Sequence, residues 1–99
     1  MIKVLLICSQ GASTAIMCDR IRAAAQEADV DMEVRAVALA VADDYMQDAD
    51  VILIGPQIRY MQTKLQKEVP NKPLADIDMY TYGTMNGKAV FEQIMELVK

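Results

Sequence analysis

Cys8 ends an apolar run of the sequence and is followed by a segment of small residues, Ser9 to Thr14. Small side chains allow successive backbone N–H groups to curl around an anion. A helix is predicted to begin at about residue 13, and its positive end favours a thiolate over a thiol at Cys8. Because the thiolate is the nucleophilic form, the pattern predicts a sulfur that carries a phosphoryl group within this loop. The alternative is a small core side chain that closes a strand.

Histidine is absent from the sequence. Its absence excludes Ser-His-Asp and Cys-His catalysis within the chain and removes the commonest zinc ligand. Cys18, the second cysteine, falls on the inner face of the predicted first helix, where an inert, packed thiol is expected. We therefore expect no metal site and no cofactor, and any histidine that takes part in the chemistry must belong to another molecule.

Composition places the chain among ordinary globular proteins, with 99 residues of which 54% are hydrophobic and 24% charged. This length fits one domain over residues 1–99, with enough apolar surface for a core. A formal net charge of −4 without a basic stripe argues against nucleic-acid binding. The apolar runs are too short to cross a bilayer and no secretory signal begins the sequence, so a cytoplasmic location with reduced thiols is expected.

Four short apolar runs alternate with helical patterns and predict a βαβαβαβα order. The run at 51–54 is continuous, as is typical of a central strand, whereas the strands at 32–37 and 73–77 suit sheet edges. With right-handed crossovers, the prediction is a three-layer α/β fold, a four-stranded parallel sheet in the order 2-1-3-4 with helices on both faces. The expected strands are 3–8, 32–37, 51–54 and 73–77, and the expected helices are 13–28, 39–47, 57–68 and one from about 87, N-capped by Asn86.

This strand order places Cys8 where ligands bind in such sheets, because the winding direction changes between the first and third strands. The loops at 55–57 and 78–86 are expected on the same rim, at the carboxyl ends of the strands. The segment after Cys8 lacks the glycine and lysine pattern of nucleotide-binding loops. Low-molecular-weight tyrosine phosphatases have an arginine six residues after the cysteine of this turn, where the chain has Thr14. Hydrolysis is therefore disfavoured relative to phosphoryl transfer.

Four segments, spaced over essentially the whole chain, carry a resemblance to a known family: VLLICSQGASTAIM, ADVILIGPQIRYM, PNKPLADID and YGTMNGKAV. They resemble the IIB component of the lactose/cellobiose (N,N′-diacetylchitobiose) family of the bacterial phosphoenolpyruvate-dependent sugar phosphotransferase system. The resemblance implies the same sheet order and the geometry of low-molecular-weight tyrosine phosphatases. It implies a phosphotransferase with a phosphocysteine at Cys8 and a phosphate loop formed by Ser9, Gln10, Gly11, Ala12, Ser13 and Thr14.

The resemblance also implies partners. The phosphoryl donor would be the phosphohistidine of a IIA protein, and the acceptor would be a sugar imported through the membrane IIC component. The chain would then be a monomer when isolated and would associate with the inner face of the membrane through IIC. A β-linked disaccharide such as cellobiose or chitobiose is the sugar expected for the family. A phosphomonoesterase or a non-catalytic regulatory relative remains the alternative.

A candidate partner-docking rim surrounds the cysteine. Its residues are Gln57, Ile58, Arg59, Tyr82 and Gly83. Turn formation explains Gln57, Tyr82 and Gly83 equally well, and an arginine in the first turn of a helix, such as Arg59, is usually solvated. Ile58 also falls on the predicted inner stripe of the helix at 57–68. Tyr60, Met61 and Met85 could add apolar contacts, but methionines at helical spacing are usually core residues. A carboxylate near an incoming phosphoryl dianion is repelled unless it is protonated, so Asp78 and Asp76 are expected to cap or shape the loop rather than to transfer protons.

Overall fold

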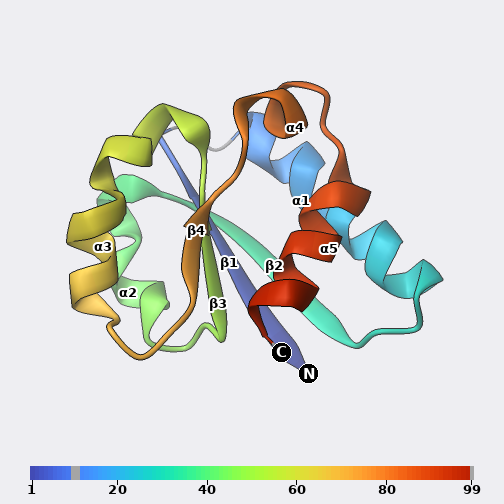
Figure 1. Ribbon diagram of the computed structural model, residues 1–99, viewed down its shortest axis with the longest axis horizontal. Helices are drawn as coiled ribbons and strands as arrows, with labels where there is room; N and C mark the ends of the chain where they lie inside the picture. The colour runs from blue at the N-terminus through green and yellow to red at the C-terminus, as the bar shows by residue number, and fades with distance from the viewer. Residues whose placement is uncertain (10–11, 99) are drawn as a thin grey trace.

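The chain is built around a four-stranded parallel sheet (Figure 1). The computed structural model describes residues 1–9 and 12–98, and of residues 12–14 it describes the backbone alone. The strand order β2-β1-β3-β4 and the α/β class confirm the predictions. The strands are β1 (Ile2–Cys8), β2 (Met32–Ala38), β3 (Val51–Ile54) and β4 (Leu74–Asp76).

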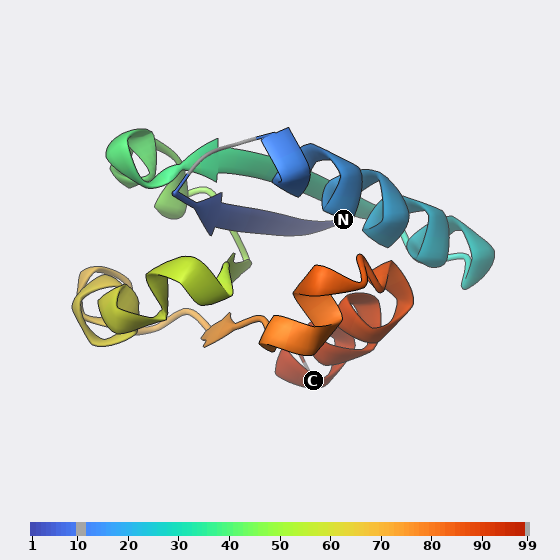
Figure 2. The ribbon, with the colours of Figure 1, turned by 90° about the horizontal axis from the view of Figure 1, so that it is seen from above.

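Helices cover both faces of the sheet (Figures 1 and 2). On one face lie α1 (Ala12–Glu27), the short α4 (Met79–Gly83) and α5 (Gly87–Leu97). On the other lie the 3-10 turn η1 (Leu39–Val41), α2 (Asp43–Met46), the 3-10 segment η2 (Pro56–Met61) and α3 (Gln62–Glu68). The predicted three-layer arrangement is therefore present.

The sheet separates two hydrophobic cores, and the central strand β3 contributes to both. Val51 and Leu53 pack with α1 and α5, whereas Ile52 and Ile54 pack with the helices of the opposite face. All four residues are fully buried. Successive side chains of a strand point to opposite faces, so a strand covered on both sides has no polar positions. This explains why the continuous apolar run correctly predicted a central strand.

Helical details differ from the prediction in three places. The helix expected at 39–47 is divided into η1 and α2, and the helix expected at 57–68 starts as η2, where Ile58 has non-helical dihedral angles (φ −116°, ψ 23°). The loop expected at 78–86 contains α4. Five residues are too few to show a helical period, so α4 depends on its cap and on tertiary packing instead.

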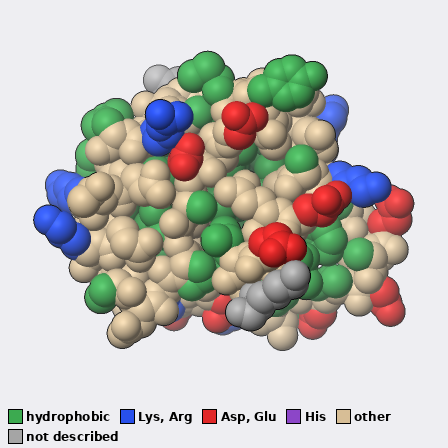
Figure 3. All heavy atoms as spheres, viewed as in Figure 1, with side chains coloured by type: hydrophobic (Ala, Val, Ile, Leu, Met, Phe, Trp, Pro, Cys, Tyr) green, Lys and Arg blue, Asp and Glu red, His purple; other side chains and the backbone are tan. Residues whose placement is uncertain are grey.

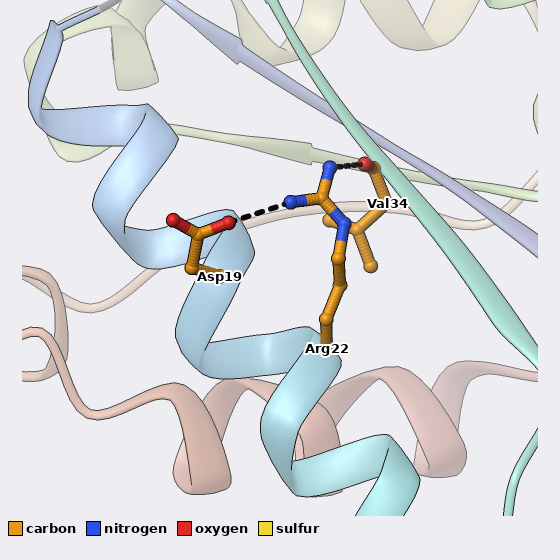
Figure 4. A network of polar contacts seen from close by, with 3 residues as sticks. All are labelled: Asp19, Arg22 and Val34. Atoms are coloured by element: carbon orange, nitrogen blue, oxygen red, sulfur yellow. Dashed lines mark hydrogen bonds and ion pairs between the residues drawn. The ribbon is translucent and has the colours of Figure 1, made fainter.

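The outer edge of β2 is covered in part by a side chain from α1 (Figure 4). The Arg22 guanidinium donates to the Val34 carbonyl and forms a second contact, from Nη1 to Asp19 Oδ1 at 2.8 Å. Edge strands expose backbone groups that can pair with other chains. Arg22 occupies one of these acceptors.

Within the described ranges, no helix is long and apolar enough to span a membrane.

Candidate functional site

Cys8 lies at the carboxyl end of β1, at the point where the sheet changes winding direction. Its side chain is 2% exposed, so it sits at the base of the rim and not on a projecting surface. The Gly55 N–H donates to the Ile7 carbonyl at 2.9 Å, which holds the segment after β3 against the end of β1. The predicted convergence of the first and third strand ends at the cysteine is thus observed.

The segment predicted to form a phosphate loop is only partly described. Ser9 is exposed, Gln10 and Gly11 lie outside the described residues, and α1 begins at Ala12. The first N–H groups of a helix have no partner within the helix, and they carry its positive partial charge. The backbone of α1 begins four residues after Cys8 and includes the predicted loop positions Ser13 and Thr14.

Cys18 has a different environment from Cys8. It lies in α1, is 2% exposed and belongs to the core between α1 and the sheet. Burial raises the pKa of the Cys18 thiol to about 11, against a smaller lowering effect of Arg22. The side chain is a neutral thiol at physiological pH, which confirms the expectation of a packed, inert cysteine. Neither cysteine forms a disulfide.

The structure corrects the predicted docking rim. Ile58 and Tyr82 are 2% and 6% exposed and belong to the two cores, so their side chains cannot form much of a docking surface. Their apolar character reflects anchoring of η2 and α4 against the sheet. Gln57, Arg59 and Gly83 are exposed on the segments that follow β3 and β4.

Other large apolar side chains are exposed on the segments that follow the strands. We call this set the apolar rim: Ile16, Val41, Tyr60, Met79 and Tyr80, whose exposed fractions range from 46% to 78%. They lie on the segments that follow β1, β2, β3 and β4, so they surround the strand ends. Hydrophobic side chains protrude along the upper edge of the molecule in Figure 3, and Figure 2 looks down on that end.

Of the apolar rim, only Tyr60 was anticipated from the sequence. Met79 and Tyr80 lie in the segment that follows the last strand, and this position was the signal that the sequence offered. Their exposure depends on α4, whose five residues have no recognisable helical period. Ile16 falls just outside the predicted inner stripe of α1, which begins at Met17. Its exposure could therefore have been predicted from the sequence.

Asp78 is the N-cap of α4. Its Oδ2 accepts hydrogen bonds from the Thr81 N–H at 2.9 Å and from the Thr81 hydroxyl at 3.1 Å. These bonds lower the pKa of the Asp78 carboxyl. An ionised acceptor that is engaged in a helix cap is not a proton donor, and the expected capping role of Asp78 is confirmed. Asp76 lies in β4, where its carbonyl accepts from Gln93 Nε2 at 3.0 Å.

A hollow bounded by described residues lies away from the cysteine. It has a volume of about 780 Å³ and is formed between α1, α4 and the start of α5. Tyr80 and Phe91 contribute to its lining, but Cys8 and Gln57 do not. Among the described residues, no group of three or more potential ligands is placed to hold a metal ion.

Comparison with known proteins assigns the family. Residues 3–93 match the family model described as "PTS system, Lactose/Cellobiose specific IIB subunit". The chain belongs to this family. Its sequence is 38% identical over 98 residues to the "PTS system oligo-beta-mannoside-specific EIIB component" of Bacillus subtilis, covering 97% of this chain and 95% of that protein. It is 32% identical over 94 residues to the galactose-specific EIIB component of Lactococcus lactis, covering 88% and 87%.

Solved structures agree with this assignment. The lactose-specific IIB domain of Streptococcus pneumoniae has the same fold, with a TM-score of 0.88, 18% identity and coverage of 99% of this chain and 98% of that one. The cellobiose-specific IIB component of Borrelia burgdorferi gives a TM-score of 0.80 with 27% identity, covering 98% and 91%. The IIB protein described here is therefore a sugar-specific component of the phosphotransferase system, in agreement with the resemblance inferred from its four sequence segments.

Proposed function

We propose that this IIB protein is a phosphocarrier in which Cys8 accepts the phosphoryl group of a phosphohistidine on a IIA protein. The Cys8 thiolate attacks phosphorus in line, an S–P bond forms, and the N–P bond breaks with its electron pair remaining on the imidazole nitrogen. The observation that carries the proposal is the place of Cys8, at the sheet's switch point and four residues before the start of α1. A helix N-terminus stabilises both a thiolate and a bound phosphoryl group.

The phosphate loop is the segment from Ser9 to Thr14, including Gln10 and Gly11. Its backbone N–H groups would bind the equatorial oxygens of the phosphoryl group, a role that requires no cofactor. The loop has Thr14 where phosphatases of similar geometry have an arginine. Without that cation the transition state for attack by water is less stabilised, so a phosphocysteine persists long enough to be passed on.

The second step delivers the phosphoryl group to a sugar. A sugar hydroxyl attacks phosphorus, an O–P bond forms, the S–P bond breaks to regenerate the Cys8 thiolate, and the hydroxyl proton is released. We propose a β-linked disaccharide such as cellobiose or chitobiose as the sugar. Two relatives support this choice, since the B. subtilis protein is named for oligo-β-mannosides and a further L. lactis relative, 31% identical, is named for cellobiose.

Two partners follow from this sequence of steps. The donor is a phosphorylated IIA protein, and the acceptor sugar is presented by the membrane IIC permease. We place the chain in the cytoplasm as a monomer of one domain that meets IIC at the inner face of the membrane. The apolar rim around the strand ends supports transient docking at the face that carries Cys8.

The test is phosphorylation of the purified protein by phosphoenolpyruvate, the general phosphotransfer proteins and candidate IIA proteins of the lactose/cellobiose family. Intact-mass measurement should find one added phosphoryl group on the wild type and none on Cys8→Ser. Cys18→Ser is the matched control and should still accept the group. A labelled Cys8→Ser protein, or a wild type that no IIA protein labels, would contradict the proposal.

Two further assays separate the alternatives. A phosphomonoesterase would hydrolyse an aryl phosphate such as p-nitrophenyl phosphate in a Cys8-dependent manner, and we expect no such turnover. A regulatory relative would accept the phosphoryl group without supporting sugar phosphorylation. Reconstitution with IIC in vesicles, supplied in turn with cellobiose, chitobiose and galactose, identifies the sugar that receives the group.

A further inference from the structure

Gly55 lies where a side chain would meet other side chains, although its backbone conformation does not call for glycine. Its dihedral angles (φ −66°, ψ 154°) are extended and open to any residue. A Cβ atom at this position would instead lie 2.8 Å from Gln57 Oε1 and 3.7 Å from Cys8 Cβ. The space above the Gly55 Cα is therefore occupied by the Gln57 carboxamide, and the same point is in van der Waals range of Cys8.

The backbone around Gln57 is held by its neighbours. The Ile58 N–H donates to the Gly55 carbonyl at 3.1 Å and closes a turn, while the buried Ile58 side chain anchors that turn in the core. Pro56 restricts the preceding backbone. The Gln57 side chain, although exposed, folds back toward the end of β1. Within the described chain, nothing forms a hydrogen bond with its carboxamide.

We propose that the Gln57 carboxamide donates a hydrogen bond to the phosphoryl group carried by Cys8. The inference rests on the proposed phosphocarrier function and deepens it. A carboxamide has two N–H donors on Nε2, and rotation of its terminal group directs them to an oxygen beside it. Being neutral, the amide binds the phosphoryl group without supplying the full positive charge that an arginine would bring to the transition state. Gly55 is glycine because a side chain there would displace this donor.

The first experiment compares Gln57→Ala with the wild type in the phosphorylation assay, using the IIA protein that labels the wild type fastest. A hydrogen bond to a charged group is lost, so kcat for phosphorylation should fall at least about tenfold while KM for phospho-IIA changes little. The matched control is Gln26→Ala, an exposed glutamine in the last turn of α1, which should behave as the wild type.

Phosphorus NMR adds a measurement, the ³¹P chemical shift of the phosphocysteine, that would not change if Gln57 served only to bind the partner. The ³¹P resonance of the phosphocysteine should shift in Gln57→Ala, because a hydrogen-bond donor to its oxygens is removed, and should not shift in Gln26→Ala. Unchanged kcat with a raised KM would mean that Gln57 serves docking alone, and an unchanged ³¹P resonance would mean that it does not touch the phosphoryl group. Either result overturns the inference.

Gly55→Ala tests the same contact without altering Gln57. The new methyl group would clash with the movable end of the Gln57 side chain, whereas it would lie at an ordinary contact distance from Cys8. It should therefore displace the amide and reduce kcat as Gln57→Ala does. The double variant should lose no more than Gln57→Ala alone. Multiplicative losses would contradict the inference. Labelling of the wild type and absence of labelling in Cys8→Ser separate failure of this inference from failure of the phosphocarrier function.

Discussion

At the scale of single residues, the two cysteines show how position decides chemistry. Both side chains are buried, yet Cys8 ends a strand just before a helix, whereas Cys18 lies in the core between α1 and the sheet. Burial in an apolar core disfavours the thiolate, which accounts for the raised pKa of Cys18. In our proposal Cys8 is therefore a nucleophile, whereas Cys18 is a packed core residue.

The raised pKa of Cys18 predicts an alkaline loss of stability. Its thiol ionises near pH 9 in the unfolded chain and near pH 11 in the folded protein, so folding takes up a proton between these values. The neutral Cys18 thiol makes its full contribution to the free energy of unfolding below pH 9. This contribution falls by about 2–3 kcal/mol as the pH rises to 11. Denaturant unfolding should find that the free-energy difference between the wild type and Cys18→Ala narrows by this amount. A constant difference across this pH range would contradict the prediction.

At the scale of elements, the start of α5 depends on a close approach to α1. A Cβ atom at Gly87 would lie 2.5 Å from the Arg20 carbonyl carbon and 2.7 Å from its oxygen, which are backbone atoms of α1. Asn86 caps the same helix, since its Oδ1 accepts from the Ala89 N–H at 3.1 Å. The cap and the glycine together fix where α5 begins and how it packs on α1.

Gly87→Ala should destabilise the protein by about 1–3 kcal/mol, because backbone atoms of α1 cannot move aside without shifting the helix. The matched control is Gly83→Ala in α4, where an added Cβ meets nothing within 4 Å. Alanine is the better helix former, so this variant should be unchanged or more stable by up to about 1 kcal/mol. Denaturant unfolding of both variants measures the difference, and equal stabilities would contradict the role given to Gly87.

The cap of α5 gives a separate prediction. Asn86→Ala removes an acceptor for one of the first N–H groups of the helix and should cost about 1 kcal/mol. Asn86→Asp retains an acceptor and should restore most of the stability. Thermal or denaturant unfolding of the two variants checks the expectation, and a full loss in the aspartate variant would show that capping is not the cause.

The sequence predicted correctly those elements in which burial alone determines the pattern of residue types. The run at 51–54 is apolar because β3 is covered on both faces, and the predicted order 2-1-3-4 followed from such differences between strands. Helix α4 was missed because it is held by the Asp78 cap and by burial of Tyr82, not by a repeating pattern. Tyr82 was placed on the docking rim because its loop matches the family resemblance and follows the last strand. Ile58 was placed there as an apolar residue near the same strand ends, and its burial agrees instead with the predicted inner stripe of the helix at 57–68.

At the scale of the whole molecule, exposed apolar side chains are confined mainly to one end. Of the six large hydrophobic side chains exposed among the described residues, five form the apolar rim, and Met1 lies at the opposite ends of the strands. Parallel strands place all the segments that follow them at one end of a sheet, so residues distant in sequence become one surface around Cys8. Large aromatic side chains on such a surface are typical anchors of protein interfaces.

The apolar rim predicts the behaviour of a double variant, Tyr60→Ser with Tyr80→Ser. Both side chains are 78% exposed, so the free energy of unfolding should change little, whereas KM for phospho-IIA should rise at least about tenfold as two interface anchors are lost. Because neither side chain is placed at the phosphoryl group, kcat should be retained, which is the opposite of the result expected for Gln57→Ala. Glu33→Ala, an exposed position near the start of β2, is the control and should leave both constants unchanged. An unaltered KM in the double tyrosine variant would show that IIA docks elsewhere, and the proposed surface would then have to be abandoned.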